Sequence, residues 1–130
     1  MPAHVDSIRS IYGAFSRGDI PAVLSALSPS VRWTEAEGFP YGGTYVGPNA
    51  VLEGVFMRLG TEWDGFAAVP ERFVSEGQTV IALGTYSGTY LRTGKGFAAP
   101  FVHVWDFENG KVVRFQQHTD TEVVRRALLP

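Results

Sequence analysis

The sequence contains no cysteine. It therefore has no disulfide framework, no thiolate nucleophile and no cysteine-based zinc site. An excess of one charge is lacking too, because 11 Lys and Arg oppose 13 Asp and Glu, for a net charge of −2. This balance gives no electrostatic footprint for nucleic acid or for an anionic membrane surface. We expect neither as a partner.

Long hydrophobic runs are also absent. No apolar segment is long enough to span a bilayer, and the chain does not open with the segments of a secretory leader. We therefore expect a cytoplasmic protein without a membrane partner. Apolar residues make up 45% and charged residues 18% of the 130 positions, which indicates one globular domain, residues 1–130. Aromatic residues reach 13%, enough either to line an apolar pocket or to form a rigid core.

Apolar spacing predicts three helices in the first half of the chain and one at its end. The second helix begins after Asp19 and ends before Pro29, the third begins at Gly47-Pro48, and the last runs from Asp120 to Leu128. The first helix has the i, i+3, i+4, i+7 stripe of an amphipathic helix, which is formed by Ile8, Ile11, Tyr12 and Phe15.

Alternation of period two predicts five strands, and the glycine-rich segment 38–47 is predicted to be a loop. The strands lie at residues 31–37, 65–75, 79–90, 97–108 and 111–119. Because helices come first and a strand meander follows, we expect an α+β fold with a curved, mostly antiparallel sheet. Helices packed on one face would leave a conical cavity, a natural place for a small ligand.

A hairpin joins the last two strands through Asn109-Gly110, the strongest short-range turn signal. When residues are paired outward from this turn, those whose numbers add up to 219 lie opposite each other. One face then meets either a ligand cavity or a second copy of the chain, and we favour the cavity for His103 and Trp105 because Asp120 continues that face. Both faces carry large side chains and only one can meet the helices, so we expect a homodimer. The mixed polar and aromatic face comprises Phe101, His103, Trp105, Phe107, Val112, Arg114, Gln116 and His118.

Three stretches resemble the SnoaL-like branch of the nuclear-transport-factor-2-like superfamily, which includes polyketide cyclases and ketosteroid isomerases. They are AFSRGDIPAVLSALSPSVRW, GGTYVGPNAV and HVWDFENGKVVRFQQHTDT. The resemblance extends over residues 6–128. It implies a cystatin-like α+β barrel with a conical cavity. It does not imply one chemistry, because this superfamily also contains dehydratases, epoxide hydrolases and binding domains without catalysis.

The resemblance to ketosteroid isomerases implies that Glu35 stands at the place of their carboxylate base. Their oxyanion hole uses a first-helix tyrosine and a protonated aspartic acid. Those places fall on Ile11 and Val102, with Tyr12 one position away and turned by about 100° around the helix. Steroid isomerisation is therefore not expected. This alignment would also turn Val102, instead of His103, toward the cavity.

The resemblance to SnoaL-type cyclases implies a different base. These enzymes use an aspartate near the end of the last strand together with a histidine, and the matching residues are Asp120 with His103 or His118. Asp120 is also an ordinary helix N-cap by its position. His103 is either a hydrogen-bonded core histidine or a pocket residue, and no third ligand accompanies the two histidines, so no metal is expected.

Glu35 alternates with Trp33, and burial beside an indole would raise the pKa of the carboxyl toward that of a useful base. An edge glutamate in water, or one paired with Arg32 or Arg114, is the alternative. Aromatic side chains and one histidine are expected to line the cavity unless they only form the core. These are Trp33, Tyr45, Phe56, Tyr86, Trp105 and His118.

The sequence thus predicts a cofactor-independent isomerase, cyclase or lyase. It would remove a proton α to a carbonyl of a small hydrophobic molecule, with Glu35 or Asp120 as the base and His103 as a relay or donor. The alternative is a dimeric ligand-binding or accessory domain without catalysis.

Overall fold

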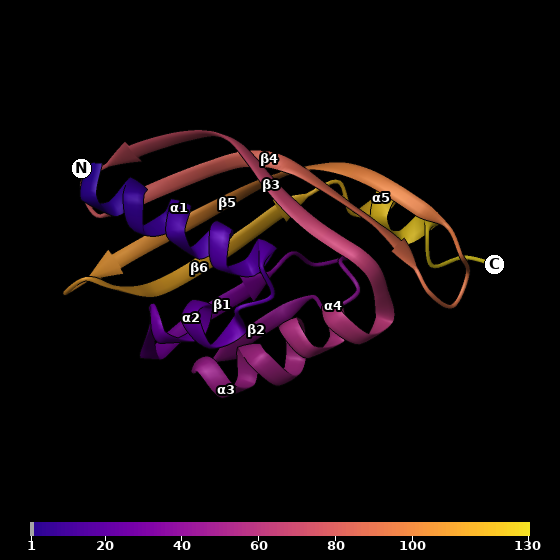
Figure 1. The fold of residues 1–130 in the computed structure, drawn as a ribbon, viewed down its shortest axis with the longest axis horizontal. Helices are drawn as coiled ribbons and strands as arrows, with labels where there is room; N and C mark the ends of the chain where they lie inside the picture. The colour runs from indigo at the N-terminus through magenta and orange to yellow at the C-terminus, as the bar shows by residue number, and fades with distance from the viewer. Residues whose placement is uncertain (1) are drawn as a thin grey trace.

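The computed structural model describes the backbone of residues 2–130 and the side chains from residue 4 onward. Six strands form one curved sheet in the order β2-β1-β6-β5-β4-β3, with helices on one face (Figure 1). The pair β1 and β6 is parallel and the other neighbours are antiparallel. The edge strands β2 and β3 do not meet, so the sheet stays open. The predicted α+β architecture is confirmed.

The helices follow the predicted apolar stripes. Helix α2 is shorter than predicted, because β1 already begins at Leu27 and Pro29 lies inside that strand. The β1–β6 register shifts between Leu27 and Arg32, an irregular stretch in which a proline is tolerated. The helical elements are α1 (Pro2–Ser16), α2 (Ile20–Ser25), α3 (Pro48–Val51), the π-helical turn η1 (Leu52–Phe56), α4 (Met57–Glu62) and α5 (Thr121–Arg126).

The strands include one that the sequence pattern missed. Residues 43–46, which lie in the predicted loop, form β2 and pair with β1, with Tyr45 opposite Trp33. Four residues are too few to show an alternating pattern. The strands are β1 (Leu27–Glu35), β2 (Gly43–Val46), β3 (Trp63–Glu76), β4 (Thr79–Tyr90), β5 (Gly96–Glu108) and β6 (Lys111–Thr119).

The β5–β6 hairpin contains a bulge that decides which side chains reach the core. Phe107 pairs with Val112 as predicted, but Asp106 pairs with Arg114, which leaves Val113 as the extra residue. Beyond the bulge the predicted register is therefore wrong by one residue. Phe115 and Gln117 turn inward, whereas Arg114, Gln116 and His118 lie on the outer face.

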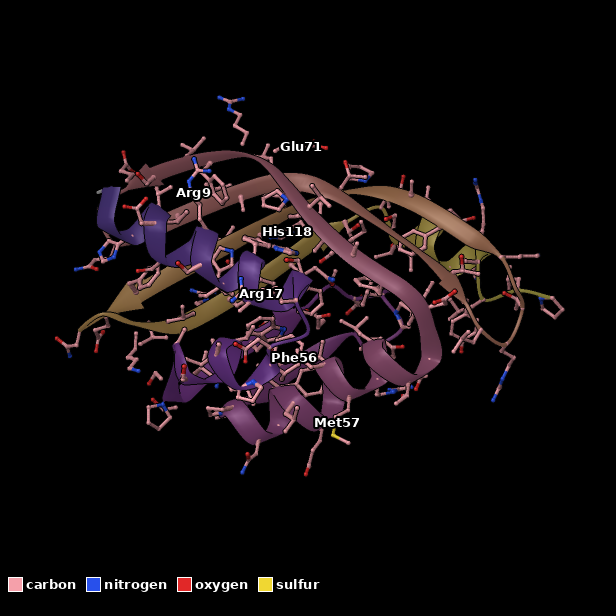
Figure 2. The ribbon with its side chains drawn as sticks, viewed as in Figure 1. Arg9, Arg17, Phe56, Met57, Glu71 and His118 are labelled. Atoms are coloured by element: carbon pink, nitrogen blue, oxygen red, sulfur yellow. The ribbon has the colours of Figure 1, made fainter. Side chains whose placement is uncertain are left out.

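Side chains from the concave face of the sheet and from the helices fill the space between these layers (Figure 2). Aromatic rings dominate this core. Trp33 of β1 stacks on Phe115 of β6 with ring centroids 3.8 Å apart, and Trp105 of β5 meets the same ring at 4.7 Å. Within the part of the chain that the structure describes, no helix is long and apolar enough to cross a membrane.

Candidate functional site

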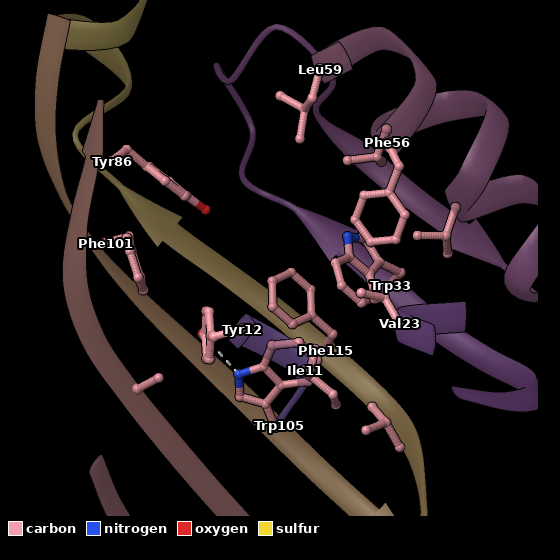
Figure 3. Packing of buried hydrophobic residues seen from close by; sticks show 14 of the residues in the cluster. Ile11, Tyr12, Val23, Trp33, Phe56, Leu59, Tyr86, Phe101, Trp105 and Phe115 are labelled. Carbon is pink, nitrogen blue, oxygen red and sulfur yellow. Dashed lines mark hydrogen bonds between the residues drawn. The ribbon is translucent and has the colours of Figure 1, made fainter. Parts of the chain in front are cut away.

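A cavity of about 50 Å³ lies between the concave face of the sheet and the helices. Its wall is mostly aromatic and aliphatic, with side chains from α1, α2, η1, α4 and five strands. Figure 3 shows part of this wall, with Phe56 facing Trp33 on one side and Tyr86 on the sheet opposite. Besides the indoles of Trp33 and Trp105, five buried side chains with polar groups border the cavity: Tyr12, Glu35, Tyr86, His103 and Gln117.

Glu35 is the only carboxylic acid among the described residues that line this cavity. Alternation along β1 turns Glu35 inward with Trp33, whose Nε1 donates a hydrogen bond to Glu35 Oε2 at 2.9 Å. Burial raises the pKa of Glu35 to about 8, and the indole hydrogen bond opposes this shift only in part. At neutral pH the carboxyl is mostly protonated.

The second carboxyl oxygen of Glu35, Oε1, has no protein partner in the part of the chain that the structure describes. Among the described residues, Glu35 has no hydrogen bond besides the one from Trp33, and no fully buried side-chain polar atom lacks a partner. Oε1 therefore keeps some accessible surface, and Glu35 borders the cavity. Trp33 holds one oxygen, and the other has no hydrogen bond from the described residues.

His103 lies at the centre of a hydrogen-bonded chain. Its Nδ1 is 2.5 Å from the Tyr12 hydroxyl, and its Nε2 is 2.5 Å from the Tyr86 hydroxyl. Trp105 Nε1 donates to the Tyr12 oxygen at 3.2 Å, and Gln117 Nε2 donates to the Tyr86 oxygen at 2.9 Å. Both ring nitrogens of His103 are therefore occupied, and the tyrosines stand at the two ends of the imidazole.

Burial lowers the pKa of His103 to about 3, and His118 adds a smaller electrostatic effect in the same direction. His103 is neutral over the physiological range. A neutral imidazole has one N–H donor and one acceptor nitrogen.

Known protein families and solved structures that are similar to this chain agree with this architecture. The model of the SnoaL-like domain matches residues 8–115. This chain belongs to the SnoaL-like family. The crystal structure of an NTF2-like protein from Burkholderia thailandensis shares 42% identity over 98% of both chains, with a TM-score of 0.95. An NTF2-like protein from Burkholderia pseudomallei shares 35% identity over 100% of both chains, with a TM-score of 0.92.

A third solved structure contains a small molecule. TerC, co-crystallised with polyporic acid, shares 30% identity over 96% of this chain and 97% of its own, with a TM-score of 0.87. No curated protein matches the sequence.

The SnoaL-like cavity includes two polar side chains that were not predicted as site residues, Tyr12 and Gln117. Tyr12 was predicted to turn away from the place that Ile11 takes, yet both residues border the cavity. The stripe of α1 already contained Tyr12, and that stripe could have identified it. Gln117 was missed because the bulge at Val113 reverses its face; its Oε1 accepts a hydrogen bond from the Ala36 N–H at 2.9 Å.

The predicted site residues divide into two groups in the SnoaL-like fold. Glu35, His103 and the aromatic residues Trp33, Phe56, Tyr86 and Trp105 line the cavity. His103, instead of Val102, is the β5 residue turned inward.

Three predicted residues do not reach the cavity. Tyr45 packs over Gly54 and donates its hydroxyl to the Tyr41 carbonyl at 2.7 Å. His118 is exposed on the outer face because of the bulge. Asp120 is exposed and caps α5, where its side chain accepts a hydrogen bond from the Val123 N–H at 3.2 Å. These placements correct the predicted site. In the described part of the chain, no three His, Asp or Glu side chains gather where they could hold a metal ion.

Proposed function

We propose that this SnoaL-like domain is a cofactor-independent enzyme that removes a proton α to a carbonyl group, with Glu35 as the base. The observation that carries the proposal is the position of this carboxyl. It is buried in the wall of an apolar cavity, Trp33 donates to one oxygen, and the other oxygen has no hydrogen bond from the described residues. An elevated pKa near the working pH is what a general base needs.

The proposed step transfers the α proton to Glu35 Oε1 and leaves an enolate in the cavity. The protonated carboxyl can return the proton to another carbon, which is an isomerisation. Alternatively, the enolate can attack a second carbonyl or expel a leaving group, which are cyclisation and elimination. Because the pKa of Glu35 is about 8, the basic form increases as the pH rises through 8. The rate should increase with it.

The likeness to TerC supports a small organic ligand, because that protein was co-crystallised with polyporic acid. The cavity of about 50 Å³ is smaller than the roughly 300–1,000 Å³ of common ligand sites. A ring-sized ligand therefore requires the wall to move. The alternative function is ligand binding without catalysis. The same mostly apolar cavity supports this alternative.

Proton exchange into 2-indanone tests the proposal without knowledge of the natural substrate. Its α protons are activated by both the carbonyl and the ring, and NMR in D2O follows their replacement by deuterium. We expect the wild type to accelerate exchange and Glu35→Gln to lose roughly 10²- to 10⁴-fold in rate. Glu37→Gln is the matched control, because Glu37 is exposed two residues away. Binding of 2-indanone without exchange above background would favour the non-catalytic alternative.

We also propose that the protein is a homodimer formed through the outer face of the sheet. The helices lie on the other face (Figure 1). On the outer face, Val74, Ile81 and Val104 follow one another across β3, β4 and β5, and Leu83 pairs with Val102 beside them. A contiguous, uncovered apolar patch of this kind is typical of an interface. A second copy would bury it symmetrically.

A further inference from the structure

We infer that the Tyr86 hydroxyl donates a hydrogen bond to the carbonyl oxygen of the ligand. The proton is the one hydroxyl proton that finds no acceptor within the hydrogen-bonded chain Tyr12–His103–Tyr86. The ligand class is then an uncharged ketone whose oxygen points at β4 while its α carbon faces Glu35. This inference rests on the proposed function for the identity of the reacting carbon. The oxygen site itself depends only on the hydrogen-bonded chain.

The chain has more protons than internal acceptors. Trp105 and Gln117 donate N–H groups at its two ends, so each tyrosine oxygen already accepts one hydrogen bond. Three protons remain, one on each hydroxyl and one on the neutral imidazole. They have only two hydrogen bonds to fill, one at each nitrogen of His103. Neither hydroxyl has another partner among the described residues. One tyrosine therefore has an O–H that is free to donate.

The tautomer of His103 determines which tyrosine this is. A proton on Nδ1 donates to Tyr12 and frees the Tyr12 O–H, whereas a proton on Nε2 donates to Tyr86 and frees the Tyr86 O–H. In the second case the Tyr12 hydroxyl donates to Nδ1, so the rest of the chain remains satisfied. Binding of an acceptor at Tyr86 therefore selects the Nε2–H tautomer.

The surroundings of the two hydroxyls favour Tyr86. Figure 3 shows the Tyr86 side chain reaching from the sheet into the space toward Trp33, with its hydroxyl at the tip. Tyr86 and Glu35 line the same cavity. Burial raises the pKa of Tyr86, and Glu35 raises it further by a smaller electrostatic effect. Gln117 joins Tyr86 to the Glu35 end of β1, because its Nε2 donates to the Tyr86 oxygen and its Oε1 accepts from the N–H of Ala36, the next residue after Glu35. The Tyr12 oxygen accepts instead from Trp105.

The same wall defines what the site rejects. No Lys or Arg side chain is among the described residues that line the cavity, so a ligand carboxylate would lose its hydration without gaining a counter-ion. A hydrocarbon of the same shape would bind without an acceptor and leave the buried O–H unpaired. A neutral carbonyl compound avoids both costs.

Binding of 2-indanone and of indane, which has the same rings without the oxygen, tests the oxygen site. The quantity to compare is the ratio of the two dissociation constants. We expect Tyr86→Phe to raise the indanone-to-indane ratio by roughly tenfold, as for the loss of one hydrogen bond. Glu37→Gln, at an exposed position outside the cavity, should leave the ratio unchanged. Unchanged indane binding shows that each variant retains its cavity.

Two spectroscopic measurements on the wild type complete the test, even if Tyr86→Phe fails to fold. The C=O stretch of bound 2-indanone should lie at the lower frequency of a hydrogen-bonded ketone, and ¹⁵N NMR should find the His103 proton on Nε2. A carbonyl frequency like that in a hydrocarbon solvent would overturn the inference. So would a ratio that Tyr86→Phe leaves unchanged. If exchange is absent while the Tyr86 dependence persists, only the proposed catalysis fails.

Discussion

At the scale of single residues, Glu35 and His103 make the folding free energy depend on pH in opposite directions. Burial raises the pKa of Glu35 from 4.5 to about 8, so its contribution to stability is complete below 4.5 and is lost as the pH rises through 8. Burial lowers the pKa of His103 from 6.5 to about 3, so its contribution is present above 6.5 and is lost as the pH falls toward 3. Both effects oppose the ionised form of a buried group.

Urea unfolding between pH 3 and 9 should reveal these two groups. Between about 4.5 and 6.5 their effects cancel, and outside this window each lowers the free energy of unfolding by at most about 1.4 kcal/mol per pH unit. Glu35→Gln should remove the decline above pH 6.5, and His103→Gln should remove the decline on the acid side. If Glu35→Gln parallels the wild type from pH 6.5 to 8, the carboxyl is not buried as the structure has it.

At the scale of elements, the loop 36–42 is the part of the cavity wall that belongs to no helix or strand among the described residues. It turns at Gly38, which has a φ of +94°, and it closes on itself through hydrogen bonds from the Phe39 N–H to the Ala36 carbonyl and from the Gly42 N–H to the Phe39 carbonyl. Phe39 is buried against the cavity. Ala36 is held by Gln117. We expect ligands to enter by displacement of Phe39.

Phe39→Ala should accelerate the association of 2-indanone, because it removes the side chain that closes this wall. It should also lower the free energy of unfolding by roughly 3–5 kcal/mol, the usual cost of such a cavity. Phe97→Ala is the matched control, since Phe97 packs against Trp63 and Phe66 and does not line the cavity. Stopped-flow binding measures the association rate of 2-indanone with each variant. Equal association rates in the wild type and Phe39→Ala would exclude this entry route.

Element patterns also explain what the sequence could and could not reveal. Alternation along β1 correctly placed Glu35 on the same face as Trp33, because that face is buried from Val31 to Glu35. The same rule failed in β6, where the extra residue Val113 turns every later side chain to the opposite face of the sheet. The apolar pattern of the sequence does not reveal this bulge. Gln117 and His118 exchanged faces for this reason. The chain from Tyr12 to Tyr86 could not be predicted either, since it joins residues far apart in sequence.

At the scale of the whole molecule, the uncovered face of the sheet predicts a dimer. Light scattering at micromolar concentration should give twice the 14.2 kDa of one chain. Val104→Glu places a charge in the middle of the apolar patch and should yield monomers. Val46→Glu, at an exposed position of edge strand β2, is the control that should stay dimeric. A wild type that scatters as a single chain would contradict the proposed interface.

The ionisation of Glu35 in the intact protein can be measured directly. Side-chain carboxyl resonances followed by ¹³C NMR from pH 3 to 9, with Glu35 assigned by its disappearance in Glu35→Gln, report the midpoint of this one group. A buried base bordering an apolar cavity predicts a midpoint near 8. A midpoint near 4.5, the ordinary value for glutamate, would contradict the site, because a solvated carboxyl has neither the burial nor the basicity that the proposed proton transfer requires.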